Sequence, residues 1–180
     1  MFSEFAKVSS ATWGVIVALL LVGIVVFAVS KDRKRWTARM LANGALCIAL
    51  STVLSFITLY KMPQGGSITL ASMLPMFLFA YAYGVGPGML VGAAYGFVQF
   101  LQGGLYFVHP VELLLDYPLA FAMLGLAGLS NKFSDQWGMI PGIILGTFGR
   151  FVCAFLSGLI FFGMYAPEGQ NVVIYSMVYN

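Results

Sequence analysis

Hydrophobic positions form long uninterrupted blocks along this chain, and polar positions are confined to the short segments between them. The apolar blocks occupy residues 14–29, 38–60, 70–83, 89–101, 111–129 and 140–165, and a shorter one closes the chain at 172–180. A helix needs about 20 apolar residues to cross the hydrocarbon core of a bilayer. The pattern therefore predicts an all-α, polytopic membrane helix bundle with six spans and a truncated last helix.

Glycine and proline mark the segments between the blocks. Residues 61–69 read Lys-Met-Pro-Gln-Gly-Gly-Ser-Ile-Thr and are expected to form a loop that acts as a mobile lid. A tight turn is expected at residues 84–88, which contain three glycines and a proline. Pro75 lies inside an apolar block, so the helix is expected either to bend there or to end its regular hydrogen-bond ladder nearby.

Composition places the whole chain in the membrane. Hydrophobic residues make up 61% of the 180 residues, charged residues 8%, and the mean hydropathy is +0.93. Soluble domains carry about 25% charged residues. One bundle without a separate soluble domain is expected. Cys47 and Cys153 both lie in apolar runs and are interpreted as small packing residues.

Basic residues are concentrated in one segment, between the first two apolar blocks. Five of the nine lysines and arginines lie there, namely Lys31, Arg33, Lys34, Arg35 and Arg39. Such a cluster marks the cytoplasmic side of a membrane protein, which places the N-terminus outside. A nucleic-acid patch is the competing interpretation of a basic run, but a basic segment between two spans is ordinarily an orientation signal. By alternation, residues 61–69, 102–110 and 165–171 share the outer side.

Two acidic residues lie in the block 111–129. Glu112 and Asp116 are four residues apart and so share one helix face. An ionisable group at membrane depth is rare unless it faces a protein interior or a water-filled cavity, and Asp116 would lie about 9 Å below the outer surface at helical rise. Asp116 is therefore a candidate site residue. Pairing with Arg150 on the next helix remains the alternative.

Two residues close to Asp116, namely Glu112 and His109, are predicted to have smaller roles. Glu112 lies nearer the interface and is expected to be solvated. His109 stands beside Pro110 in a loop, where a hydrogen-bonding role is expected. Aromatic and amide side chains surround the acid in the predicted topology: Tyr106, Tyr117, Phe161, Phe162, Tyr175 and Asn180.

This combination predicts a pocket for a flat organic cation. The carboxylate supplies the counter-charge, aromatic faces supply cation–π attraction of about 0.5–2 kcal/mol, and hydroxyls and amides fix orientation. Membrane-interface or packing roles for the aromatic residues are the alternative. No catalytic motif appears, and His109 is the only histidine. Neither an enzyme nor a metal or cofactor site is expected.

Three segments carry a resemblance to a known family. They are Lys61-Met-Pro-Gln-Gly-Gly-Ser-Ile-Thr-Leu, Tyr106 with His109-Pro-x-x-x-x-Leu-Asp116-Tyr117-Pro-Leu-Ala-Phe, and Tyr175-Ser-x-x-x-Asn180. Together they resemble the ThiT/YuaJ thiamine transporters, the membrane-embedded substrate-binding (S) components of energy-coupling factor transporters in Gram-positive bacteria. The resemblance covers roughly residues 38–180.

The resemblance implies roles for individual residues. Asp116 stands where the family usually has a glutamate that contacts thiamine. Further thiamine contacts are implied at Tyr117, Tyr106, Tyr175 and Asn180. This chain has Phe162 in place of a stacking tryptophan, Ala154 in place of a histidine, and Ser67 near a loop tryptophan.

The resemblance also implies partners and a domain division. Ala45-x-x-x-Ala49 matches the motif that docks on a transmembrane coupling subunit, which works with ATPase subunits. Residues 1–37 form an extra N-terminal span and a basic cytoplasmic linker. Residues 38–180 form the thiamine-transporter-like domain without most of its last helix, because residues 172–180 rise only about 14 Å as a helix. The extra span is hypothesised to fill part of the vacant position.

The predicted function is high-affinity capture of thiamine from outside a bacterial cell and its uptake with an energy-coupling module. The partners are then thiamine, the coupling and ATPase subunits and the lipid bilayer, with no nucleic acid. Three alternatives stay open: a stand-alone proton-coupled thiamine carrier, an S component for another vitamin, and a structural membrane subunit that binds no ligand.

Overall fold

The computed structural model describes residues 36–61, 67–103, 109–132, 138–162 and 171–179. Its elements in chain order are α3 (Ala38–Phe56), β1 (Thr58–Lys61), β2 (Ser67–Thr69), α4 (Leu74–Tyr83), α5 (Val85–Gln102), α6 (Pro110–Leu114), the π-helix η1 (Leu115–Leu119), α7 (Ala120–Met123), the 3₁₀ helix η2 (Leu124–Lys132), α8 (Met139–Phe161) and α9 (Val172–Tyr179). The predicted span at 14–29, most of the basic linker and the proposed filling of a vacant position lie outside the described residues.

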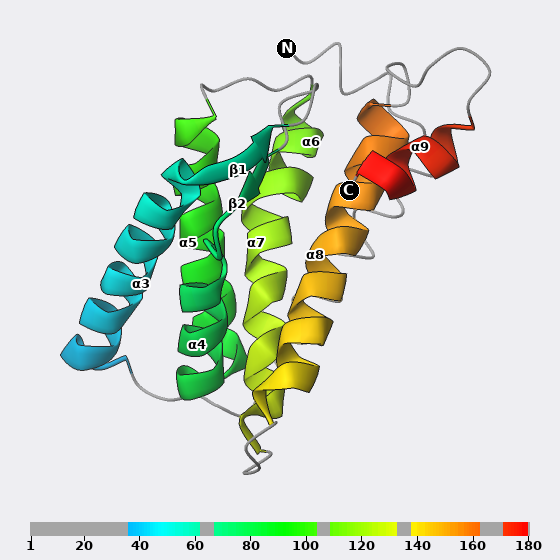
Figure 1. Cartoon of the computed structure of the whole chain (residues 1–180). Helices are drawn as coiled ribbons and strands as arrows, with labels where there is room; N and C mark the ends of the chain where they lie inside the picture. The colour runs from blue at the N-terminus through cyan, green and yellow to red at the C-terminus, as the bar shows by residue number, and fades with distance from the viewer. Residues whose placement is uncertain (1–35, 62–66, 104–108, 133–137, 163–170, 180) are drawn as a thin grey trace.

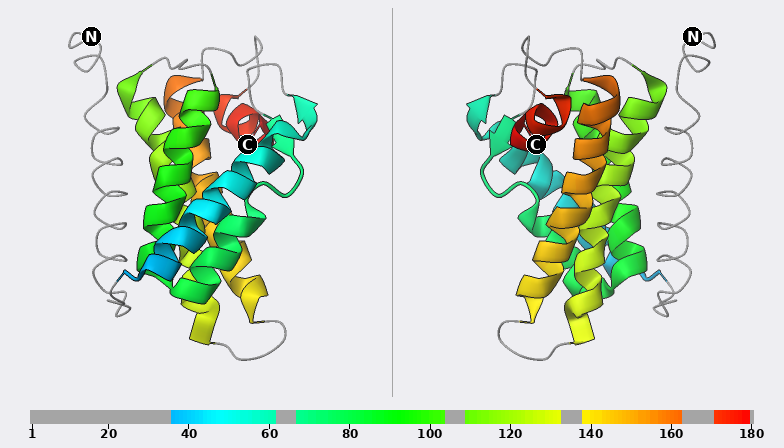
Figure 2. Two further views of the ribbon diagram at one scale, coloured as in Figure 1. Left: turned by 90° about the vertical axis from the view of Figure 1, so that its left-hand side faces the viewer. Right: turned by 90° about the vertical axis from the view of Figure 1, so that its right-hand side faces the viewer.

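The long helices lie side by side in a bundle, and the small elements gather at one end of it (Figure 1). Helices Ala38–Phe56, Pro110–Ser130 and Met139–Phe161 are long and apolar enough to cross a membrane, and Leu74–Tyr83 is a shorter apolar helix. The β1–β2 hairpin, α6 and α9 share one end of the bundle in every view (Figure 2). The prediction of a helical membrane bundle is confirmed. The predicted six spans and truncated last helix are not confirmed, because the described residues contain three candidate spans.

Residues 58–69 depart from the predicted helix and loop. The helix expected over 38–60 ends at Phe56, and an antiparallel hairpin follows with Thr58 opposite Thr69 and Lys61 opposite Ser67. The β-branched residues Thr58, Ile68 and Thr69 and the aromatic Tyr60 favour extended backbone. The segment predicted as a lid is therefore a hairpin over its described residues, and residues 62–66 lie outside them.

Proline positions set the starts of α4 and α5. Pro75 lies in the first turn of α4, where its missing N–H costs no hydrogen bond. The regular helix of this block therefore begins at Leu74, so the expected interruption of the ladder near Pro75 is found, in place of a bend within the helix. The tight turn expected at 84–88 is also shorter than predicted. Gly84 alone turns the chain, with φ 96, and helix α5 begins at Val85.

The helix that carries the acids is not one regular α-helix. Its middle turn, Leu115–Leu119, is π-helical and contains Pro118. Proline has no backbone N–H to donate to the carbonyl one turn before it, and a widened turn accommodates the missing helical hydrogen bond. Asp116 and Tyr117 both lie on this π-turn, a type of distortion that is frequent at functional sites.

Small residues hold the acid-bearing helix close to α5. A Cβ added at Gly96 would lie 2.5 Å from the Tyr117 carbonyl oxygen and 2.7 Å from its carbon. Gly92 makes the same kind of approach to Phe121, and glycines at this spacing let two helices approach closely. The core beside this contact contains Phe77, Phe79, Tyr95, Phe121 and Leu124.

Helix α3 shows the two faces expected of a lipid-exposed span. Its outer side chains include Leu46, 67% exposed, and Val53, 60% exposed, as suits a face solvated by lipid. Ala45 and Ala49 lie on the exposed part of this helix, whereas Gly44 is buried against Val91 and Phe79. The alanine pair is therefore accessible from outside the bundle.

Candidate ligand-binding site

A cavity of about 600 Å³ lies at the end of the bundle where the hairpin and α9 meet the long helices. This volume falls in the usual range of small-molecule sites, about 300–1,000 Å³. Its walls come from the end of α3, the hairpin, α5, the acid-bearing helix, α8 and α9. The lining residues are Ser55, Phe56, Thr58, Lys61, Ser67, Thr69, Ser72, Met73, Gln99, Gln102, Gly103, Glu112, Asp116, Tyr117, Phe121, Arg150, Ala154, Gly158, Phe162, Tyr175 and Ser176.

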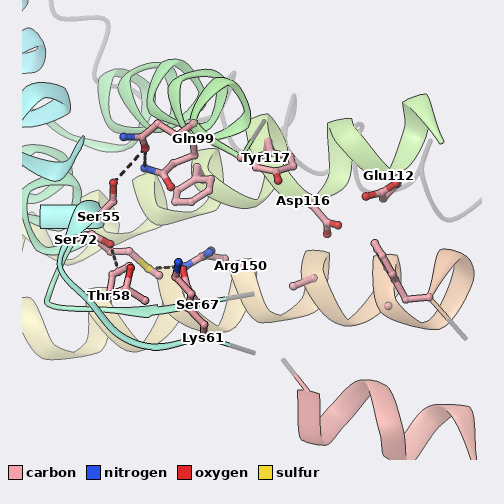
Figure 3. A pocket seen from close by; sticks show the side chains of 18 of the residues that line it. Ser55, Thr58, Lys61, Ser67, Ser72, Gln99, Glu112, Asp116, Tyr117 and Arg150 are labelled. Atoms are coloured by element: carbon pink, nitrogen blue, oxygen red, sulfur yellow. Dashed lines mark hydrogen bonds between the residues drawn. The ribbon is translucent and has the colours of Figure 1, made fainter. Parts of the chain in front are cut away.

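Asp116 extends from the π-turn into the space between its helix and α8 (Figure 3). Ser157, fully buried on α8, donates its hydroxyl to Asp116 Oδ2 at 2.8 Å. This hydrogen bond holds the carboxylate in place and leaves its other oxygen for a ligand. Sequence inspection did not single out Ser157, because a serine among small residues of a span gives no distinctive signal.

The sequence left open an ion pair between Arg150 and Asp116 as an alternative, and the structure does not form it. Arg150 Nη1 lies 2.8 Å from Met73 Sδ, and its guanidinium carbon lies 4.4 Å from the centre of the Phe121 ring. Across the described parts of the chain, no ion pair joins Arg150 to Asp116. The arginine instead forms part of the cavity wall, a placement that the sequence did not predict.

The expectation that Glu112 is solvated is wrong. Glu112 is only 3% exposed, and its Oε2 accepts a hydrogen bond of 3.1 Å from the backbone N–H of His109. His109 Nδ1 accepts from the Val111 N–H, so the two side chains form a capping box at the start of α6. A capping box satisfies N–H groups that lack helical partners. Glu112 also reaches the cavity wall.

His109 has a structural position rather than one in the cavity. It is 5% exposed and its ring stacks on Phe161, with centroids 5.2 Å apart. Phe161 packs with Val111 and Leu115 in a small core cluster. Neither His109 nor Phe161 lines the cavity, although the hydrogen-bonding role expected for the histidine is present.

Three of the aromatic residues named from the sequence line the cavity, namely Tyr117, Phe162 and Tyr175. The Tyr117 ring meets Phe100 edge to face, with centroids 5.4 Å apart. Ser67 and Ala154 lie on the wall as well. Tyr106 and Asn180 lie outside the described residues. The structure thus brings together residues that are far apart in the sequence around one carboxylate.

A connected set of polar side chains forms the wall between α3 and α5. Gln99 Nε2 donates to the Tyr95 hydroxyl at 2.9 Å and to Gln102 Oε1 at 2.6 Å. Ser55 donates to the same Gln102 oxygen at 3.1 Å. The sequence analysis missed this wall, although the two amide side chains of Gln99 and Gln102 near the end of an apolar helix were a usable signal for it.

An apolar bundle that encloses a cavity lined by carboxylate, aromatic and amide groups defines a class: multi-pass membrane proteins that hold a small polar solute. Residues 41–180 match the family described as Thiamine transporter protein (Thia_YuaJ). The chain belongs to this family of thiamine transporters.

Individual relatives agree with this assignment. The chain is 35% identical over 149 residues to the thiamine transporter ThiT of Bacillus subtilis, covering 76% of this chain and 77% of that protein. It is 32% identical over 122 residues to ThiT of Lacticaseibacillus paracasei, covering 60% and 61%. A solved structure of ThiT from Listeria monocytogenes superposes with a TM-score of 0.67 at 27% identity, covering 77% of this chain and 81% of that one.

Proposed function

We propose that this protein captures thiamine in the cavity beside Asp116 and mediates its uptake across the cell membrane. One observation carries the proposal: the only acid on the π-turn faces a cavity lined by aromatic side chains. Within the described residues Asp116 accepts a hydrogen bond from Ser157 and forms no ion pair, and a partly buried carboxylate of this kind favours a ligand that brings a positive charge. Membership of the thiamine transporter family supports thiamine as that ligand.

Each wall residue has a part in this proposal. Asp116 supplies the counter-charge, and Tyr117, Phe162 and Tyr175 supply ring faces for stacking and cation–π attraction. Tyr106 and Asn180 are proposed as further contacts by family resemblance. Glu112 adds negative potential at the cavity wall while its main role is to cap α6. Ser67 contributes a hydroxyl from the hairpin.

The energy for uptake is proposed to come from separate coupling and ATPase subunits. Ala45 and Ala49 are accessible on the outer face of α3, and small side chains let another membrane helix approach closely. This pair is therefore the proposed contact with the transmembrane coupling subunit. A stand-alone proton-coupled carrier would instead transport thiamine in cells that lack those subunits.

The cavity is proposed to face the outside of the cell, with Arg39 at the opposite, cytoplasmic end of α3. In protein whose two cysteines, Cys47 and Cys153, are replaced by alanine, Ser67→Cys should react with a membrane-impermeant thiol reagent added to intact cells. Arg39→Cys should react only after permeabilisation. The reverse pattern would contradict this orientation.

Calorimetric titration of the detergent-purified protein with thiamine tests the binding function. Saturable binding at one site per chain is expected, with no displacement by the uncharged vitamin riboflavin. Displacement of thiamine by riboflavin would favour another vitamin as substrate. The absence of any heat of binding, in monodisperse protein, would favour a structural subunit.

A further inference from the structure

The β1–β2 hairpin has two unlike faces. Ser67 and Thr69 line the cavity, whereas Ile68 between them does not and is 51% exposed. Successive side chains of a strand point to opposite faces of the sheet, so Ile68 lies on the face turned away from the cavity. Tyr60 is opposite Ile68 in the register and is 58% exposed, and side chains that lie opposite each other share a face. The hairpin is therefore polar toward the cavity and apolar on its outer face.

This outer face belongs to a larger apolar surface. Neighbouring large side chains are exposed as well: Ile57 and Leu70 are each 46% exposed, and Leu59 is 63% exposed. Contiguous exposed apolar patches mark surfaces that a partner or a membrane covers. In both views of Figure 2 the hairpin lies at the outer edge of the bundle. Whatever covers its outer face therefore reaches it from outside the bundle.

The position of the hairpin along the bundle points to the lipid bilayer as this cover. Helix α3 has 19 residues, which rise about 28 Å, close to the hydrocarbon thickness of about 30 Å. Its side chains Leu46 and Val53 are exposed along this length. The helix ends at Phe56, and strand β1 begins at Thr58. The hairpin thus lies where a span leaves the hydrocarbon core, at the level of the lipid headgroups.

The backbone and Tyr60 limit how deep the hairpin can lie. Its two strands form a two-stranded sheet within the described residues, so each strand has one edge without a neighbouring strand. Backbone groups at such an edge are costly in hydrocarbon, where no water can bond them, whereas the headgroup region contains water. Tyrosine is enriched at this level of membrane proteins. Both features favour the interface over the hydrocarbon core.

We propose that the outer face of the hairpin, formed by Leu59, Tyr60 and Ile68, lies in the interface of the lipid leaflet at the cavity end of the bundle. Amphipathic helices at membrane surfaces insert their apolar face about 5–10 Å, and the hairpin has the same depth. The leaflet then supports one wall of the cavity, because the same two strands carry the lipid-facing and the cavity-facing side chains. This inference goes beyond the proposed function, since it holds whichever solute the cavity binds.

The test measures the depth of a single spin label in the full chain, reconstituted in vesicles of phosphatidylcholine and phosphatidylglycerol. Cys47 and Cys153 are replaced by alanine, and a nitroxide is attached at Ile68→Cys. Collisions of the label with oxygen, which dissolves in lipid, should exceed collisions with a water-soluble nickel chelate. The depth obtained from the ratio of the two collision rates should be about 5–10 Å.

Ser67→Cys is the matched control, because Ser67 is the preceding residue of the same strand and lines the cavity. Its label should collide more often with the nickel chelate than with oxygen. Val53→Cys, on the exposed face of α3, is the reference for a lipid-facing position and should collide mainly with oxygen.

More frequent collisions with the chelate than with oxygen at Ile68→Cys would overturn the inference, because the outer face would then lie in water. Few collisions with either reagent would also overturn it and would indicate that protein, such as a second copy of this chain, covers the face. Should Ile68→Cys not yield monodisperse protein, Leu59→Cys on the same apolar surface decides in the same way. Thiamine plays no part in this measurement, so failure of thiamine to bind would overturn the proposed function alone.

Discussion

At the scale of single residues, the carboxylate of Asp116 depends on one buried hydroxyl. Ser157 is fully buried and donates to Asp116 Oδ2. Hydrogen bonds to charged groups contribute about 1.5–3 kcal/mol to the free energy of unfolding. The serine therefore stabilises the charged acid before any ligand arrives.

Ser157→Ala should accordingly lower the melting temperature of the ligand-free protein by a few degrees, because the acid loses its donor inside the bundle. Thermal unfolding of purified protein in detergent measures this. Thr147→Ala on the exposed face of α8 is the control and should change little. Equal melting temperatures for both variants would show that the hydroxyl does not stabilise the acid.

At this scale, the sequence predicted Asp116 as a site residue but did not predict that Arg150 lines the same cavity. Asp116 was recognisable because an acid inside an apolar span has few explanations. Arg150 was visible too, but only as the alternative partner of Asp116. The direction of a long side chain depends on packing against Met73 and Phe121, which no local pattern encodes.

At the scale of elements, the π-turn is held in place by its contact with α5. Gly96 allows the backbones to meet, because any Cβ at that position would lie 2.5 Å from the Tyr117 carbonyl oxygen. The turn carries both Asp116 and Tyr117, so its position relative to α5 determines where the acid points. This close approach connects Gly96, which does not itself line the cavity, to the position of the proposed ligand.

Gly96→Ala should weaken thiamine binding and lower stability together, since relieving the clash must shift the π-turn. Overpacking of this kind typically costs about 1–3 kcal/mol. Calorimetry and thermal unfolding measure the two effects. Ala94→Ser on the exposed side of α5 should affect neither, and normal binding by Gly96→Ala would contradict this role for the helix contact.

Periodicity predicted the helices of the bundle and missed the irregular elements. The hairpin at 58–69 reads from sequence as the end of a helix and a glycine-rich loop, because apolar residues such as Leu59 suit both helix and strand. The π-turn was equally invisible, since Pro118 predicts only an interruption. Both irregular elements line the cavity, so the least predictable parts of the chain build the site.

At the scale of the whole molecule, the surfaces proposed for thiamine binding and for contact with a coupling subunit are different. The cavity lies at one end of the bundle, and the exposed pair Ala45 and Ala49 lies on the outer face of α3. Two separate surfaces allow one to be altered while the other is kept.

Replacing Ala45 and Ala49 by phenylalanine should therefore abolish thiamine uptake in cells that express the coupling subunits, because bulky rings prevent a close helix contact. Calorimetric affinity for thiamine should stay the same. Leu46→Phe on the same helix, already large and 67% exposed, is the control and should keep uptake. Normal uptake by the double variant would place the coupling contact elsewhere.

The most direct test of the central claim is the thiamine affinity of Asp116→Asn compared with Asp116→Glu. Asparagine keeps the size and hydrogen-bonding capacity of the side chain but removes its charge, so binding should weaken by about tenfold or more. Glutamate keeps the charge and should retain most of the affinity. Unchanged affinity of Asp116→Asn, measured by calorimetry on monodisperse protein, would contradict the account that this carboxylate is the counter-charge of the vitamin.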